Sequence, residues 1–476
     1  MRRQLNPLHN QSRSLRAVLL GAFAIACLAL THGPAGTDRA HASSQRDTGG
    51  VPQATCFWFG PATMSNPATN LAYPEESAIY WGARFRLPTG ATLLLDGKYP
   101  HARFMSLNAY LDKASTDDLF DTEIKPKKGS VNPYLPGARR YAKNRAYTVS
   151  VPGPGTPTAG LKNVLDSQAD GTGIQELIYR VYMPDSSSDR STGSLPKPSV
   201  RLRSGKILRG AKACRTINDS QRYFTMQTMP TNLYTALVNS AGNDPISNPA
   251  QDPLRWEKYF NLQLALSIFS YGATDESSRV NAKALGEQGA YYDNKAVKYL
   301  VGPINQTYGK VLMLQGKLPT TPSTGKSVKT MGSGQMRFWS ICENSSPVET
   351  QGIDCVNDAE LKGLIDAQRN YTVVVSRSVD RPTKAVAGCN VAWLDWGEAT
   401  DILGRRSGTL VIRNLGSDPG FANSAQKITI DDVDVTKNDN GGVSTDNQRG
   451  VMGDYLPTGT YFADKTAFDS SFDCGG

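Results

Sequence analysis

His101 is the side chain of this sequence best suited to acid–base chemistry. The other histidines, His9, His32 and His41, all lie in the first 42 residues. A Ser-His-Asp hydrolase would have to use His101 as its base, and no Gly-x-Ser-x-Gly elbow is present to supply the nucleophile. A histidine-based metal site needs more than one imidazole. We therefore assign no catalytic residue and predict a structural or solvent-facing role for His101, with a catalytic or ligand-binding role as the alternative.

Two arginines occupy matching places in two similar segments, Arg103 in ARFMSL and Arg337 in MRFWSI. An arginine that points inward needs a partner, because burying an unpaired charge is costly. We expect each to meet a carboxylate or several backbone carbonyls. The alternative is that each holds an anionic ligand, since the guanidinium fork fits carboxylate and phosphate groups.

Aromatic and acidic residues supply the remaining candidates. Trp393 and Trp396 bracket a short segment in which one indole ring could stack on a sugar. Asp431, Asp432 and Asp434 offer oxygen ligands for calcium, but their spacing does not fit an EF-hand, and a hydrated turn is the commoner explanation. The sequence has no phosphate-binding GxxxxGK[ST] motif and no GxGxxG motif after a strand, so we expect no nucleotide cofactor, and no other cofactor is indicated.

The amino-terminal segment has the pattern of an export signal. Basic residues precede an apolar run over 17–30, and a small-x-small site follows at Ala40-His41-Ala42. We predict that residues 1–42 are a removed signal peptide and that the mature chain begins near Ser43. A retained membrane anchor and a lipoprotein attached through Cys27 are the alternatives. No later stretch is apolar enough to serve as a transmembrane anchor after cleavage.

Six further cysteines follow the predicted signal, an even number in a chain expected to enter an oxidising compartment. They are Cys56, Cys214, Cys342, Cys355, Cys389 and Cys474. None lies in a CxxC pair, which disfavours a redox motif or a zinc knuckle. We predict three disulfides. Cys342 and Cys355 are expected to pair across neighbouring strands, and the pairing of the other four stays open.

The chain repeats itself in four landmarks that occur twice in the same order. LLLDGKYP at 93–100 returns as LMLQGKLP at 312–319, and the ARFMSL segment returns as MRFWSI. RAYTVSV at 145–151 matches RNYTVVV at 369–375, and LIYR at 177–180 matches LVIR at 410–413. We therefore predict a mainly β protein of two related β-sandwich or jelly-roll-like domains, 43–214 and 301–476. The insertion Thr320–Gln335 of the second copy is expected to be an exposed loop.

Residues 215–300 differ in character and are predicted to be a helical connector. Asp252-Pro253 has the form of a helix start. Apolar residues then recur every four positions from Trp256 to Ile268, and Gly272 would end the helix. A weaker helical pattern covers 294–300.

The sequence resembles a family of uncharacterised exported bacterial proteins with tandem β-sandwich domains of unknown function. The segments that carry this resemblance occur in the order CFWFGP, GKYPHARFMSLNAY, YRVYMPD, MRFWSIC, YTVVVS and MGDYLP. The resemblance covers most of the chain after the predicted signal. It implies a fold and brings no catalytic residues with it.

Charge and motifs together narrow the function. The chain has 52 basic and 43 acidic residues, and they form no basic run with interleaved aromatics, so nucleic acid is not an expected partner. We predict a secreted or periplasmic protein of the cell envelope, not evidently catalytic, that binds an envelope or extracellular ligand or partner. The alternatives are a secreted carboxylate-dependent hydrolase that acts on carbohydrate and a structural subunit of a surface assembly.

Overall fold

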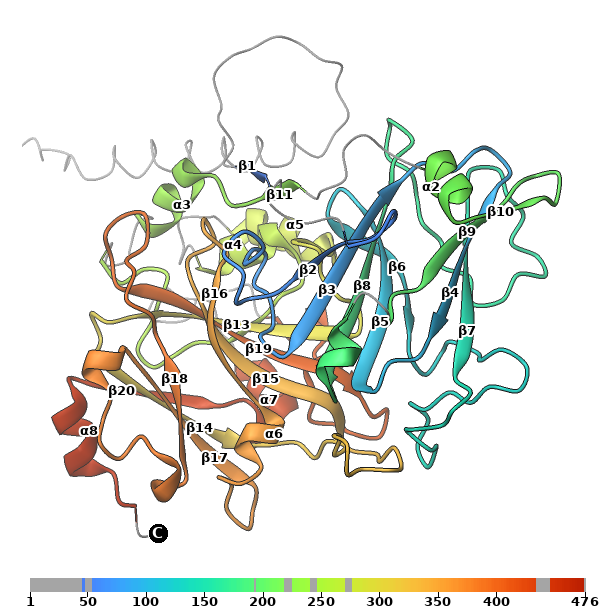
Figure 1. The fold of residues 1–476 in the computed structure, drawn as a ribbon. Coiled ribbons are helices and arrows are strands. Elements are labelled where there is room, and N and C mark those ends of the chain that lie inside the picture. Colours follow the sequence, from blue (N-terminus) through green and yellow to red (C-terminus); the bar gives the residue numbers. More distant parts are fainter. Residues whose placement is uncertain are drawn as a thin grey trace, which may run out of the picture.

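The protein is mainly β and contains two sandwiches that lie side by side (Figure 1). The computed structural model describes residues 45–47, 54–191, 194–217, 225–239, 246–269, 276–433 and 446–474. The predicted signal peptide, with Cys27, lies outside the described residues. Among the described helices, none has the length and apolar character needed to cross a membrane.

The first sandwich consists of a five-stranded sheet facing a four-stranded one. The five-stranded sheet has the order β2-β3-β8-β5-β6, with β2 (Phe59–Ala62), β3 (Ala78–Phe85), β8 (Gln175–Pro184), β5 (Ala102–Leu111) and β6 (Ala114–Phe120). The four-stranded sheet has the order β10-β9-β4-β7, with β10 (Ile207–Arg209), β9 (Lys197–Arg201), β4 (Thr92–Lys98) and β7 (Ala146–Pro152). Side chains alternate along each strand. Leu177, Tyr179 and Val181 of β8 therefore enter the core between the two sheets.

The second sandwich has the same composition of sheets. Its five-stranded sheet has the order β12-β13-β19-β15-β16, with β12 (Glu257–Lys258), β13 (Val297–Asn305), β19 (Ser407–Ser417), β15 (Met336–Asn344) and β16 (Gly352–Asn357). Its four-stranded sheet has the order β18-β17-β14-β20, with β18 (Val391–Asp395), β17 (Asn370–Ser376), β14 (Val311–Lys317) and β20 (Thr458–Phe462). Leu410 and Ile412 of β19 enter the core between them.

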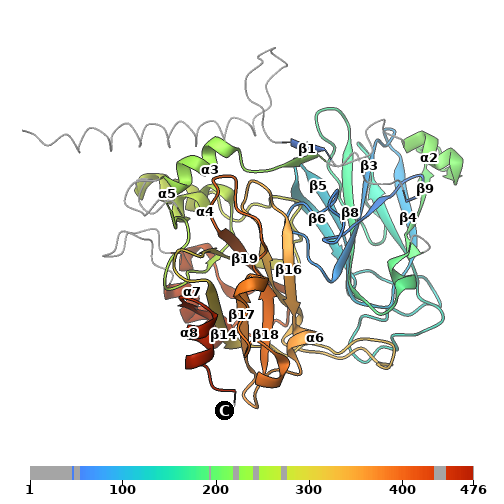
Figure 2. The ribbon, with the colours of Figure 1, turned by 60° about the vertical axis from the view of Figure 1, so that its left-hand side comes forward.

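Short helices and one small ribbon complete the described structure. The helices are α2 (Ala211–Ile217), α3 (Thr231–Val238), α4 (Leu262–Phe269), α5 (Glu276–Ala284), α6 (Asp358–Leu361), α7 (Asp446–Met452) and α8 (Lys465–Ser471). The ribbon pairs β1 (Gln45–Asp47) with β11 (Thr225–Gln227). Helices α3, α4 and α5 lie together above the second sandwich in both views (Figures 1 and 2).

The four repeated landmarks occupy equivalent strands. LLLDGK forms β4 and LMLQGK forms β14, each between two neighbours of its four-stranded sheet. The next three landmarks form β5 and β15, β7 and β17, and β8 and β19. The four landmark strands thus follow one another in the same chain order in both sandwiches, although the second sandwich has the additional strand β18 between β17 and β19.

The registers of the two copies also match. Arg180 lies opposite Ser106 on one side and Tyr80 on the other. Arg413 lies opposite Ser340 and Tyr299 in the same way. A one-residue slip would turn every core side chain to the other face, so equal registers preserve equal buried faces.

A glycine in β4 and one in β14 are required by the same close approach. Gly97 lies opposite Tyr147 and Gly316 opposite Tyr371. A Cβ atom would come within 2.3 Å of the Tyr147 ring in the first copy and 2.8 Å of the Tyr371 hydroxyl in the second. Glycine at both places leaves room for a tyrosine ring to cover the strand.

The two sandwiches pack through the outward faces of their five-stranded sheets. Phe104 and Tyr182 of the first sandwich share one buried cluster with Phe338 and Leu415 of the second, and the rings of Tyr182 and Phe338 are 5.5 Å apart. Figure 2 shows the first sandwich, in blue to green, against the yellow-to-red second one. Burial of these aromatic residues favours contact between the two sheets.

The helix predicted to begin at Pro253 begins nine residues later, at Leu262. The Asn261 side chain accepts a hydrogen bond from the Leu264 backbone N–H at 2.7 Å and so caps the helix. Trp256 instead precedes it, next to strand β12. The predicted end at Gly272 lies outside the described residues.

Two further expectations are wrong in part. The pattern over 294–300 runs into a strand, because β13 begins at Val297 and pairs with β19 along its whole length. The insertion Thr320–Gln335 does not protrude freely. Met331 is 2% exposed within the core of the first sandwich, and its backbone exchanges hydrogen bonds with Gly137 and Ala138. The insertion therefore joins the second copy to the first.

Candidate functional site

The two predicted arginines are used reciprocally between the sandwiches. Arg103 of β5 forms a buried ion pair with Asp358, which directly follows β16 of the second sandwich. Arg337 of β15 pairs at 2.9 Å with Asp121, which directly follows β6 of the first. Each arginine thus meets a carboxylate, as the structural interpretation of the sequence expects. Anion binding by either one stays a prediction.

Each of these carboxylates is also fixed within its own sheet. An Asp121 oxygen accepts a hydrogen bond from the Met105 backbone N–H, and an Asp358 oxygen accepts one from the Trp339 backbone N–H, both at 3.1 Å. Met105 and Trp339 occupy matching places in the repeated segments. The paired contacts therefore relate the two sandwiches as the two subunits of a symmetric dimer are related.

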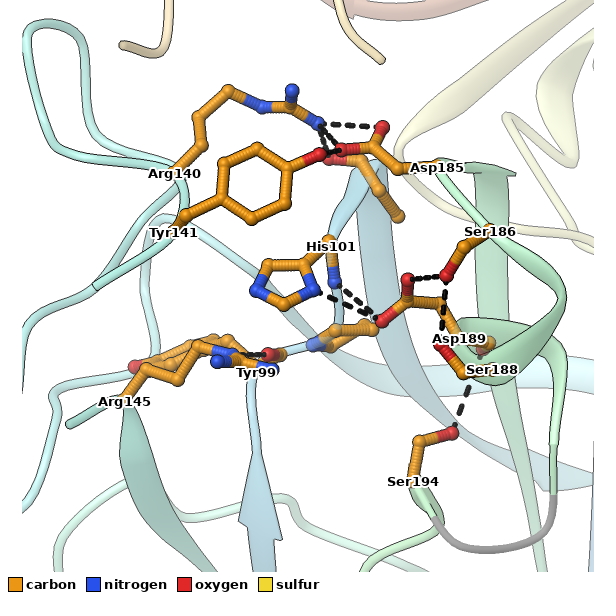
Figure 3. A network of polar contacts seen from close by, with 12 residues as sticks. Tyr99, His101, Arg140, Tyr141, Arg145, Asp185, Ser186, Ser188, Asp189 and Ser194 are labelled. Atoms are coloured by element: carbon orange, nitrogen blue, oxygen red, sulfur yellow. Dashed lines mark hydrogen bonds and ion pairs between the residues drawn. The ribbon is translucent and has the colours of Figure 1, made fainter. Parts of the chain in front are cut away.

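His101 belongs to a polar network on the first sandwich (Figure 3). Its Nδ1 atom lies 3.3 Å from Asp189, and its ring stacks on Tyr141 with centroids 4.5 Å apart. The neighbouring Arg140 forms an ion pair with Asp185. The Nε2 atom has no hydrogen-bond partner among the described residues, so no described serine hydroxyl is placed for His101 to activate.

Trp393 and Trp396, the residues predicted to offer a sugar-binding surface, have different surroundings. The Trp393 indole donates to the Ser376 hydroxyl at 3.0 Å, and the Arg381 guanidinium lies 4.4 Å from its ring centre. Trp396 is 4% exposed and belongs to the second core. Its burial makes it unsuitable as a surface platform. Ligand binding by Trp393 stays a prediction.

Of the three aspartates proposed for calcium, Asp434 lies outside the described residues. The Asp431 side chain is 92% exposed. The Asp432 carboxylate accepts hydrogen bonds from the backbone and hydroxyl of Thr429 at the start of a short turn. Asp432 thus stabilises the turn locally.

Three disulfides join the six cysteines. Cys342 and Cys355 lie directly opposite each other on β15 and β16, with Cα atoms 4.0 Å apart. The other bridges, which the sequence left open, are Cys56–Cys214 and Cys389–Cys474. Bridges of this kind are typical of exported proteins.

A cavity of about 270 Å³ lies where the two sandwiches meet the helices α3 and α4. Strands β3 and β8 contribute to its wall from the first sandwich, and β12, β13 and β19 from the second. An apolar cavity of about 150 Å³ is enough to hold benzene. This cavity can therefore hold a larger ring system or a short hydrocarbon chain, and it is the strongest candidate site among the described residues.

Tyrosine dominates the cavity wall. The eight tyrosines that line it are Tyr73, Tyr80, Tyr182, Tyr234, Tyr259, Tyr291, Tyr292 and Tyr299. Burial raises the pKa of Tyr291 to about 12, so its hydroxyl stays protonated at neutral pH. The Tyr259 hydroxyl is buried and has no hydrogen-bond partner among the described residues. Such rings offer apolar faces together with hydroxyls for hydrogen bonds.

Two of these tyrosines lie in turns that share an unusual backbone conformation. Ala72 and Tyr73 both have positive φ, and so do Tyr291 and Tyr292. In each copy the pair lies shortly before the first long strand of the five-stranded sheet, β3 or β13. Side chains rarely adopt this left-handed conformation, and functional sites are enriched in it. The duplicated turn places Tyr73 and Tyr292 at the cavity.

Arg180 and Arg413 bring positive charge to the same wall. They are equivalent residues of β8 and β19, in the repeated LIYR and LVIR segments, and both are at most 3% exposed. Both arginines lie within the repeat, but the sequence did not indicate them as site residues, because their segments resemble ordinary strands. Only the packing of the two outward faces shows that both guanidinium groups line one cavity.

Comparisons with known proteins place few constraints on the site. No family model matches the sequence, and no curated protein is significantly similar to it. Similar solved structures include an uncharacterised protein from Burkholderia cenocepacia, with a TM-score of 0.41, 13% identity and coverage of 76% of this chain and 78% of that one. Another is the VPA0106 protein from Vibrio parahaemolyticus, with a TM-score of 0.36, 10% identity and coverage of 78% and 89%. These similarities assign no function.

Proposed function

We propose that this protein binds a small, largely apolar ligand in the cavity between its two sandwiches. The cavity itself is the observation that carries this proposal. Tyrosine rings and aliphatic side chains form most of its wall, and a few polar groups converge on it, which is the usual composition of a small-molecule site. The role is one of binding and not of catalysis.

We further propose that the protein works outside the cytoplasm, in the periplasm or as a secreted protein. The three disulfides support this location, and so does the signal-like sequence over 1–42. The expected ligand is therefore a molecule of the envelope or of the surroundings.

We also propose that the sandwiches are an internal duplicate, with domains at 43–214 and 301–476 and a connector between them. The equal strand order of the five-stranded sheets, their equal registers and the reciprocal ion pairs support it. In that arrangement the ligand lies between two copies of one fold, where ligand sites commonly form.

The neutral dye N-phenyl-1-naphthylamine, whose fluorescence increases in apolar surroundings, tests ligand binding. We expect saturable binding by the folded protein. Ala265 of α4 lines the cavity, and Ala265→Trp should remove most of the binding because the indole fills the space. The matched control is Ala359→Trp on the exposed face of α6. Absence of saturable binding, or equal binding by both variants, would contradict the proposal.

A further inference from the structure

The two equivalent arginines of the cavity have different charge partners. The Arg413 guanidinium lies 3.3 Å from the Glu75 carboxylate and donates a second hydrogen bond to the Tyr73 backbone carbonyl. The charge of Arg413 is therefore neutralised by Glu75 of the other sandwich, and Glu75 is 0% exposed.

Among the described residues, Arg180 makes hydrogen bonds only to neutral acceptors. Its Nη1 atom donates to the Asn108 side chain at 2.7 Å and to the Tyr110 hydroxyl. Its Nη2 atom donates to the backbone carbonyls of Tyr292 and Asp293. Among the ion pairs of the described residues, none includes Arg180.

The difference arises at a single pair of equivalent positions. Glu75 precedes β3 by the same spacing as Asn294 precedes β13, and the surroundings of the two agree closely. The Glu75 backbone N–H donates to the Tyr80 hydroxyl, and the Asn294 backbone N–H donates to the Tyr299 hydroxyl. An amide thus occupies the place where the other copy has a carboxylate, and the Nδ2 atom of this buried amide has no partner among the described residues.

The acidic group that remains near Arg180 is a weak substitute. Asp293 also lines the cavity, but its side chain accepts a hydrogen bond from the Ser115 backbone N–H. Burial raises the pKa of Asp293 and outweighs the lowering effect of the Ser115 hydrogen bond and of the Arg180 charge, which favours the neutral form of Asp293. A buried guanidinium without a charged partner is costly, and an anion entering the cavity would supply one.

We propose that the cavity selects amphiphiles with a single carboxylate, and that Arg180 binds that carboxylate while the tyrosine-lined space holds the apolar part. This inference rests on the proposed ligand-binding function and names its ligand class. The Nη atoms of Arg180 already donate four hydrogen bonds to neutral acceptors, so the side chain offers the carboxylate its Nε–H group and its positive charge. Neutral analogues of the same shape should bind the apolar space but lack this contact.

The test compares octanoate with 1-octanol by isothermal titration calorimetry at neutral pH. For the unmodified protein we expect octanoate to bind at least about tenfold more tightly than octanol, because only octanoate supplies the charge partner. Asn294→Glu places a carboxylate where Glu75 stands in the other copy. It should weaken octanoate binding by about tenfold or more and leave octanol binding within about twofold.

Gln368→Glu adds the same charge at an exposed site outside the cavity and should change neither ligand's affinity. Arg180→Met provides a second removal of the contact if Asn294→Glu does not fold. Equal binding of octanoate and octanol to the unmodified protein would overturn this inference while the ligand-binding proposal stands. Failure of both ligands and of the neutral dye would instead overturn the proposed function. Full octanoate binding by a folded Asn294→Glu protein also contradicts the role of Arg180.

Discussion

Removing Arg103 should destabilise the protein strongly, because it leaves a buried carboxylate without its partner. The side chains of Arg103 and Asp358 are 3% and 1% exposed. After Arg103→Met, Asp358 keeps the hydrogen bonds from the Trp339 backbone and the Thr321 hydroxyl, both from neutral groups. Breaking a buried ion pair in this way costs about 3–5 kcal/mol of unfolding free energy.

Adding Asp358→Asn to Arg103→Met should recover part of that loss. The amide oxygen still accepts the hydrogen bond from Trp339, and no charge remains unpaired. We expect the double variant to be about 2 kcal/mol more stable than Arg103→Met alone. The measurement is urea unfolding followed by tryptophan fluorescence, with the disulfides intact.

An exposed ion pair supplies the control. Lys127 and Asp96 are 2.6 Å apart, but their side chains are 45% and 43% exposed. Lys127→Met should therefore cost less than about 1 kcal/mol. A cost of Arg103→Met no larger than that of Lys127→Met would contradict this prediction. A double variant as unstable as the sum of its two single variants would contradict it as well.

Two further predictions concern the second sandwich and the disulfides. Replacing both cysteines of a bridge by alanine should lower the free energy of unfolding by about 3 kcal/mol at Cys342–Cys355 and by about 5 kcal/mol at Cys56–Cys214. The second loss is larger because its loop spans 158 residues and the first spans 13. Urea unfolding that shows a larger loss for the first bridge than for the second would contradict this. Burial raises the pKa of Glu343 well above 4.5, so the folded state binds this proton more tightly and its contribution to stability falls as pH rises above about 4.5. Glu343→Gln should therefore raise the melting temperature more at pH 8 than at pH 4, and an equal change at both would count against the raised pKa.

The strands of the fold could be predicted because their buried faces alternate in the sequence itself. The β4 and β14 segments share a pattern of three apolar residues followed by a polar residue, Gly and Lys, and the mainly β class expected from them is confirmed. The start of α4 was predicted too early because Trp256 and Phe260 follow a helical spacing although they pack from an extended segment. Their burial comes from the sandwich beside them, so the local pattern did not reveal their backbone.

The candidate site was beyond sequence reasoning for a different reason. Arg180 and Arg413 become neighbours of one cavity only when two outward sheet faces meet. The partners of Arg103 and Arg413 are separated from them by 255 and 338 residues. The sequence correctly indicated that a buried arginine needs a partner, but spacing along the chain carries no information about contacts so distant.

The reciprocal contacts between the sandwiches have a consequence for how this protein can change. In a dimer of identical chains, each substitution at a symmetric interface alters both of its equivalent contacts at once. Here each contact is encoded twice, at independent positions of one chain, as with Glu75 in one copy and Asn294 in the other. A substitution therefore affects one contact and leaves its counterpart to maintain the interface, so the two halves can acquire different chemistry without losing their attachment.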